Sequence, residues 1–148
     1  MAIEGSASIE IDAPIEEVFE VAADVEQSPR WQPDIKRAQV KERDEDDRQV
    51  LVRTETDAKV RTLGSDLRFT YHPPTAMQWQ QEKGDLKSVE GSWTLEDLGN
   101  GRTRATYWME VDLGRMLGAV IRGPLVDALR KQLVESMPEK LKNDVERV

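Results

Sequence analysis

The sequence contains no cysteine and only one histidine, His72. Without cysteine there is no disulfide framework, no thiolate nucleophile and no zinc site of the cysteine type. A single histidine also excludes metal sites that are built from several imidazole ligands. We therefore expect neither a metal ion nor a cofactor.

An excess of positive charge and a long apolar run are also missing. The formal net charge at pH 7 is -8, so the chain lacks the basic surface that nucleic acid or anionic lipid requires. The longest apolar run, Met116–Ile121, is too short to cross a bilayer, and segment 1–12 lacks the pattern of a secretory signal. We expect a cytoplasmic protein with no nucleic-acid partner and no integral membrane association, and the oligomeric state stays open.

The length of 148 residues favours one domain that spans 1–148. Ile9 and Ile11 predict a short first strand. Pro14 then opens a helix whose apolar stripe comprises Ile15, Val18, Phe19 and Ala22. Two prolines between positions 24 and 33 exclude a regular helix there. We expect a short helical turn and a loop that presents Trp31.

From Ile35 to Val111 the apolar period is two, which predicts six further strands. The strands are separated by short turn signals, so neighbours must be antiparallel, with one buried and one wet face. The acidic run 42–47 is expected at a solvated hairpin tip. In the fourth strand, Ala58 and Val60 have the opposite parity to Leu67, which predicts a bulge near Gly64.

The C-terminal third predicts one long helix that begins at Pro124. Leu129, Leu133, Met137 and Leu141 form its apolar face, and Pro138 should kink it. Together these elements predict an α+β fold, in which a curved antiparallel seven-stranded sheet wraps around the long C-terminal helix. The expected order is one strand, two helices, six strands and the helix.

Two stretches carry a family resemblance. In segment 9–40 the features are Ala13-Pro14, the helix around Val18 and Phe19, Asp24, and the Trp31-x-Pro33 pair. Segment 90–107, EGSWTLEDLGNGRTRATY, adds Gly91, Trp93, Leu95 and Gly101. With these features the chain resembles the polyketide cyclase/dehydrase and lipid-transport family of the START-like, helix-grip (SRPBCC) superfamily, from about Ser8 to Glu146. Such a resemblance specifies fold better than function.

The resemblance implies a ligand cavity between the long helix and the concave face of the sheet. Strand parity, the apolar face of the predicted helix and the Trp31 loop then give the residues that would line it: Val52, Thr54, Thr56, Leu67, Phe69, Tyr71, Met77, Trp79, Gln81, Trp93, Tyr107, Met109, Leu129, Leu133 and Met137. A mostly apolar hollow with few polar groups is typical of small-molecule sites. The alternative is that these residues fill a solid core.

No catalytic residues can be assigned from the sequence. Parity places His72 on the wet face, so no Ser-His-Asp arrangement is expected. The favoured function is therefore the binding or carriage of a small hydrophobic molecule, such as a lipid, a polyketide or another aromatic or isoprenoid compound. A cyclase or dehydratase that acts in the same cavity is the first alternative, and an interaction protein with an incidental pocket is the second. Segment 113–123 is expected to be either a mobile lid or a permanently packed short helix.

Overall fold

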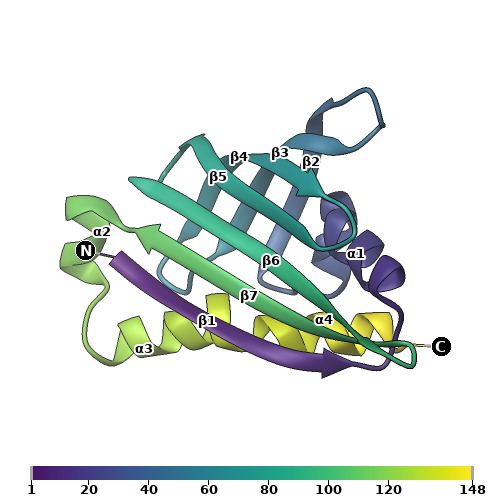
Figure 1. The fold of residues 1–148 in the computed structure, drawn as a ribbon. Helices are drawn as coiled ribbons and strands as arrows, with labels where there is room; N and C mark the ends of the chain where they lie inside the picture. The colour runs from purple at the N-terminus through teal and green to yellow at the C-terminus, as the bar shows by residue number, and fades with distance from the viewer. Residues whose placement is uncertain (1, 148) are drawn as a thin grey trace.

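Seven antiparallel strands form one sheet in the computed structural model, which describes residues 2–147 (Figure 1). The spatial order is β1-β7-β6-β5-β4-β3-β2. The strands are β1 (Ala2–Ile11), β2 (Ile35–Arg43), β3 (Gln49–Asp57), β4 (Thr62–His72), β5 (Ala76–Gly84), β6 (Ser88–Gly99) and β7 (Arg102–Asp112). Strands β2 to β7 follow one another in sequence order, which confirms the predicted meander, and the structure adds β1 beside β7.

Helical segments join and cover these strands. They are α1 (Ile15–Ala23), η1 (Val25–Arg30), α2 (Gly114–Val120), α3 (Pro124–Arg130), η2 (Lys131–Glu135) and α4 (Met137–Val145). In Figure 1, α3 and α4 run along the sheet, and α1 lies at one end of it. This arrangement confirms the predicted α+β helix-grip fold. No helix between residues 2 and 147 is long and apolar enough to cross a membrane.

The first strand is longer than the sequence pattern predicts. It pairs with β7 from Ala2, opposite Asp112, to Ile11, opposite Thr103. The pattern around Ile9 and Ile11 missed the first half because its inward positions include Gly5, which has no apolar side chain to reveal the alternation. Glycine allows close packing of β1 against the C-terminal helix, because a Cβ at Gly5 would lie 3.3 Å from Val134.

The start of the fourth strand was also predicted incorrectly. Ala58 and Val60 belong to the turn before β4, where the Ala58 amide donates to the carbonyl of Arg61. The phase slip that was expected near Gly64 is an irregularity between Asp66 and Leu67. The opposite parity of the two turn residues therefore reflects a turn and not a strand.

The predicted long helix is divided into three parts. After α3 the chain makes a π-helical turn, in which the Ser136 amide donates to the carbonyl of Lys131 at 3.0 Å, five residues back. Pro138 lies in the first turn of α4, where a missing amide proton costs little. The wider turn before Pro138 takes the place of the simple kink that the sequence predicts.

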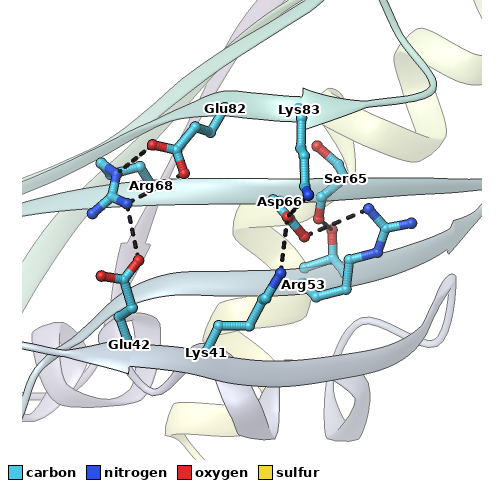
Figure 2. Close-up of polar contacts among 9 residues, drawn as sticks. Lys41, Glu42, Arg53, Ser65, Asp66, Arg68, Glu82 and Lys83 are labelled. Atoms are coloured by element: carbon cyan, nitrogen blue, oxygen red, sulfur yellow. Dashed lines mark hydrogen bonds and ion pairs between the residues drawn. The ribbon is translucent and has the colours of Figure 1, made fainter.

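The outer face of the sheet carries a network of charged side chains on β2 to β5 (Figure 2). Asp66 is 2% exposed, and the nitrogens of Lys41, Arg53 and Lys83 lie 3.2, 3.5 and 4.0 Å from its carboxylate. Parity correctly placed Asp66 on the outer face, but long basic side chains from three strands cover it there. The result is a buried carboxylate on a face that was expected to be wet.

Candidate functional site

Aromatic rings on the central strands form a chain across the inner face of the sheet. The ring centroids of Phe69 and Trp79 are 5.7 Å apart, those of Trp79 and Tyr107 5.7 Å, and those of Tyr107 and Trp93 4.6 Å. These residues come from β4, β5, β7 and β6, and each is less than 9% exposed. Alternation along four neighbouring strands therefore brings four rings together under the C-terminal helix.

A cavity of about 110 Å³ lies between these rings and the C-terminal helix. Besides the four rings, its lining includes Met77, Met109 and Met137, which are three of the five methionines in the chain. Thioether side chains are unbranched and flexible, so they can reshape a cavity at low energetic cost. The full lining is Ala22, Val25, Ser28, Gln32, Asp34, Ile35, Thr54, Thr56, Leu67, Phe69, Met77, Trp79, Trp93, Tyr107, Met109, Gln132, Leu133, Met137 and Lys140.

Polar residues of the lining come mainly from two segments, the η1 region and the C-terminal helix. Ser28, Gln32 and Asp34 belong to the first segment, and Gln132 and Lys140 to the second. Lys140 and Asp34 form an ion pair at 3.5 Å, and their side chains remain 25% and 34% exposed. This ion pair therefore lies where the cavity meets solvent.

Tyr107 is the one titratable group of the lining that is deeply buried. Burial raises its pKa because the charged phenolate would lose its hydration. Its hydroxyl lies 3.7 Å from the sulfur of Met109, which is a weak partner. The hydroxyl therefore stays protonated at neutral pH and can orient a ligand, but it cannot act as a base.

Eleven of the residues that the sequence placed at the site line the cavity. Ten of them are Thr54, Leu67, Phe69, Met77, Trp79, Trp93, Tyr107, Met109, Leu133 and Met137. The eleventh is Thr56, which was expected from the same parity. The parity assignment thus selects the correct face on β3 to β7.

Three apolar residues that were expected at the site lie elsewhere. Trp31, Val52 and Leu129 are buried in the hydrophobic core and do not line the cavity. For Val52 and Leu129 the face was correct, but neighbouring side chains close over them, and alternation does not report such packing. Trp31 is not presented by its loop, because its ring is 6% exposed.

Two polar residues expected at the site are also outside the cavity. The Tyr71 hydroxyl donates to the carbonyl of Gln49 at 2.6 Å. Gln81 donates to the carbonyl of Leu86 and accepts from the Ser65 hydroxyl, both at 2.8 Å. Both side chains connect neighbouring segments of the sheet, so their hydrogen-bonding groups are not available to a ligand.

The predicted exposure of the strand residues holds with two exceptions. Trp79, Trp93 and Tyr107 are buried, and Gln80 is exposed. Met109 is only half-buried. Thr106 is half-buried instead of exposed, because its hydroxyl lies 2.7 Å from that of Ser8 on β1.

Eight lining residues were not predicted from the sequence. They are Ala22, Val25, Ser28, Gln32, Asp34, Ile35, Gln132 and Lys140. Three of them were close to the sequence pattern. Ala22 belongs to the apolar stripe of α1, Gln132 directly precedes Leu133, and Lys140 follows Met137 by three residues. The irregular segment 24–35 carries no periodicity from which its inward side chains could be found.

The single histidine lies away from the cavity. His72 is exposed, as parity predicts, and it does not line the cavity. Residues 2–147 contain no cluster of histidine and carboxylate side chains suited to a metal ion. Segment 113–123 contributes nothing to the cavity lining.

Comparisons with known proteins agree with this geometry. A START superfamily protein from Mycobacterium smegmatis has a TM-score of 0.83 at 22% identity, and the match covers 97% of each chain. A protein from Thermus thermophilus has a TM-score of 0.80 at 23% identity over 96% of each chain. The Zhui aromatase/cyclase from Streptomyces sp. R1128 has a TM-score of 0.76 at 17% identity, over 99% of this chain and 95% of that one.

None of the curated proteins compared with the chain matches it. The sequence itself matches the family described as polyketide cyclase / dehydrase and lipid transport over residues 2–146. That match spans nearly the whole chain and agrees with the fold of the solved structures. The chain therefore belongs to the polyketide cyclase/dehydrase and lipid transport family.

Proposed function

We propose that this protein binds and carries a small, mostly apolar molecule in the cavity between the sheet and the C-terminal helix. The observation that supports this function most strongly is the lining itself. Four aromatic rings and three methionines form the apolar part of the lining, and most of its polar side chains come from the η1 region and the C-terminal helix. Ligand sites commonly combine such a lining with a few fixed polar groups that orient the ligand.

The size of the cavity limits the ligand. A dry cavity of about 150 Å³ is known to hold benzene, and the hollow here measures about 110 Å³. The hollow is therefore somewhat smaller than one that holds a single ring, and even one ring requires a small adjustment of the lining. Larger ligands would need movement of the flexible side chains of Met77, Met109 and Met137, or an opening beside the Asp34–Lys140 pair.

Catalysis in the same cavity is the alternative. The Zhui protein is described as an aromatase/cyclase, and a shaped pocket alone can orient a reactive chain. In this chain, however, the buried Tyr107 stays protonated, and Lys140 and Asp34 neutralise each other. Binding and carriage require no further group and are therefore the function we favour.

The test is binding of toluene to the purified protein, followed through NMR chemical shifts of the Trp79 and Trp93 indoles. We expect saturable shifts of both indoles. Met109→Phe should abolish them by filling the cavity. Met116→Phe is the matched control, because Met116 is 86% exposed and is not part of the lining. Absence of saturable binding, or equal binding by the Met109 variant, would overturn the proposal and leave the cavity incidental.

A further inference from the structure

Two buried polar atoms of the cavity lining have no hydrogen-bond partner among residues 2–147. They are Oγ of Ser28 and Oε1 of Gln132. Ser28 is 3% exposed, so bulk water does not replace the missing partner. Buried polar groups are nearly always hydrogen-bonded, and two unpartnered atoms in one cavity indicate a polar group of the ligand.

The orientation of the Gln132 amide fixes which kind of group it can accept. Its Nε2 donates to the backbone carbonyl of Asp57 at 2.7 Å. A carbonyl can only accept, so the nitrogen of the amide must face it and the oxygen must face away. Oε1 therefore requires a hydrogen-bond donor. A ligand carboxylate or ketone, which only accepts, cannot satisfy it.

Ser28 complements this requirement. A hydroxyl donates one hydrogen bond and accepts others, and the Ser28 hydroxyl does neither within the described chain. Its backbone carbonyl is already occupied by the amides of Trp31 and Gln32. Ser28 lies in η1 and lines the cavity, so its hydroxyl is available to a ligand oxygen.

The charges of the lining favour a neutral ligand. Asp34 and Lys140 line the cavity and form an ion pair with each other at 3.5 Å. A ligand anion would have to take Lys140 away from Asp34, and it would also meet the oxygen of Gln132. The aromatic rings of Phe69, Trp79 and Trp93 lie on the sheet side of the same hollow.

We propose that the cavity selects neutral hydroxylated compounds, above all phenols, whose apolar ring contacts the aromatic residues. The hydroxyl hydrogen of the ligand is donated to Gln132 Oε1, and a ligand oxygen accepts from the Ser28 hydroxyl. One hydroxyl can serve both residues, or two hydroxyls on one ligand can serve one each. This inference rests on the proposed binding function and adds the chemical class of the ligand.

Phenol and toluene are the matched probes, because they differ by a hydroxyl in place of a methyl group. Their dissociation constants are measured by NMR titration for the unchanged protein, Ser28→Ala and Gln132→Met. We expect each substitution to weaken phenol binding about five-fold, the worth of one hydrogen bond, and to leave toluene binding within about two-fold. Ser65→Ala, which removes a hydroxyl that bonds Gln81 outside the cavity, should change neither probe.

Benzoate completes the series as the anionic probe, and we expect it to bind at least about ten-fold more weakly than phenol. Phenol binding that is unaffected by both substitutions, or benzoate binding as tight as that of phenol, would overturn the inference while toluene binding still supports the proposed function. Failure of all three probes to bind the unchanged protein would overturn both. The Ser28 variant keeps the test decisive if the Gln132 variant folds poorly, because its hydroxyl has no partner to lose.

Discussion

The indole of Trp79 lies directly over Gly91, its register partner on the neighbouring strand β6. A Cβ built on Gly91 would overlap the six-membered ring and the ring nitrogen of that indole. Glycine at this position therefore leaves room for Trp79 to lie flat against the inner face of the sheet. The shape of the cavity beside Trp79 depends on a side chain that is absent.

We predict that Gly91→Ala will displace the Trp79 indole toward the cavity. Overpacking of this kind costs about 1–3 kcal/mol of the free energy of unfolding. Denaturant unfolding measures that loss, and toluene titration should show weaker binding because the cavity shrinks. Ser92→Ala, on the opposite face of the same strand, should leave both quantities nearly unchanged. An unchanged indole signal in Gly91→Ala would contradict the prediction.

Leu133 and Leu129 offer a comparison between a residue beside the cavity and one in the solid core. Leu129 is 1% exposed and does not line the cavity, whereas Leu133 does. Truncation of a buried leucine to alanine costs about 2–5 kcal/mol, depending on the void that results. We expect Leu133→Ala to cost about 2 kcal/mol and Leu129→Ala clearly more, in denaturant melts of equal slope. A larger loss at Leu133 would argue for a solid core there.

Asp66 should make the protein sensitive to acid. Burial alone would raise its pKa, but the hydrogen bond from Lys41 and the charges of Lys41, Arg53 and Lys83 lower the pKa below the ordinary value. The stability that these contacts provide is therefore present above the unfolded pKa of about 4 and is lost as the pH falls through the folded pKa.

We predict that Asp66→Asn will lower the free energy of unfolding at pH 7 by about 1.5–3 kcal/mol, the range for hydrogen bonds to charged groups. The difference from the unchanged protein should shrink as the pH falls through the folded pKa of Asp66, where the carboxylate takes up a proton. Glu82→Gln removes an exposed partner of Arg68 and should cost less than about 1 kcal/mol. A pH-independent difference would show that the contacts of Asp66 are not charge-dependent.

The glutamates Glu4, Glu110 and Glu90 lie opposite one another on β1, β7 and β6. The hydrogen bond with Glu4, followed by desolvation and the charges of Glu4, Glu90 and Asp112, raises the pKa of Glu110. The pKa of Glu110 is raised whereas that of Asp66 is lowered, so the effect of pH on stability is reversed. The folded state loses stability as the pH rises from the unfolded pKa through the folded one.

We therefore expect Glu110→Gln to stabilise the protein at neutral pH and to make little difference at acidic pH, where the unchanged side chain is protonated. Thermal melts at several pH values between 3 and 7 provide the measurement. Glu96→Gln is the control on the same face, because Glu96 pairs with Arg104 and should not stabilise. Destabilisation by the Glu110 substitution at pH 7 would contradict the assignment.

Sequence periodicity predicts those parts of the fold whose side chains alternate without interruption. Strand parity correctly placed Trp79, Trp93 and Tyr107 on one buried face. A one-residue slip in the register would have exposed all three. Parity fails where an inward position has no side chain, as at Gly5, and where a turn such as that of Ala58 is itself buried. In these places the pattern of apolar residues does not show whether the chain forms a strand or a turn.

The candidate site was harder to predict than the fold. Periodicity specifies a face but not a position along it, so Tyr71 was assigned to the site although its hydroxyl bonds the Gln49 backbone. Ser28 and Asp34 come from an irregular segment, and only tertiary structure brings them to Gln132. The apolar half of the cavity lining is thus visible in the sequence, whereas the polar half depends on packing.

The ion pair between Asp34 and Lys140 lies where a ligand would pass, since both residues line the cavity and remain partly exposed. It connects the segment after η1 to α4, the two segments that would have to separate. Segment 113–123, for which a lid was one of two expectations from the sequence, does not line the cavity. The structure therefore favours the side of Asp34 as the opening.

We predict that Lys140→Met will speed both association and dissociation of toluene, with little change in affinity, because the bond that opening must break is removed. A partly exposed ion pair is worth at most about 1 kcal/mol, so the rates should rise by no more than about five-fold. Amide exchange in residues 25–34 should accelerate with them. Lys142→Met is the matched control, because Lys142 pairs with Glu146 outside the cavity. If toluene instead protects residues 113–123 and the rates of Lys140→Met are unchanged, the ligand passes on the side of α2, and the ion pair has only a structural role.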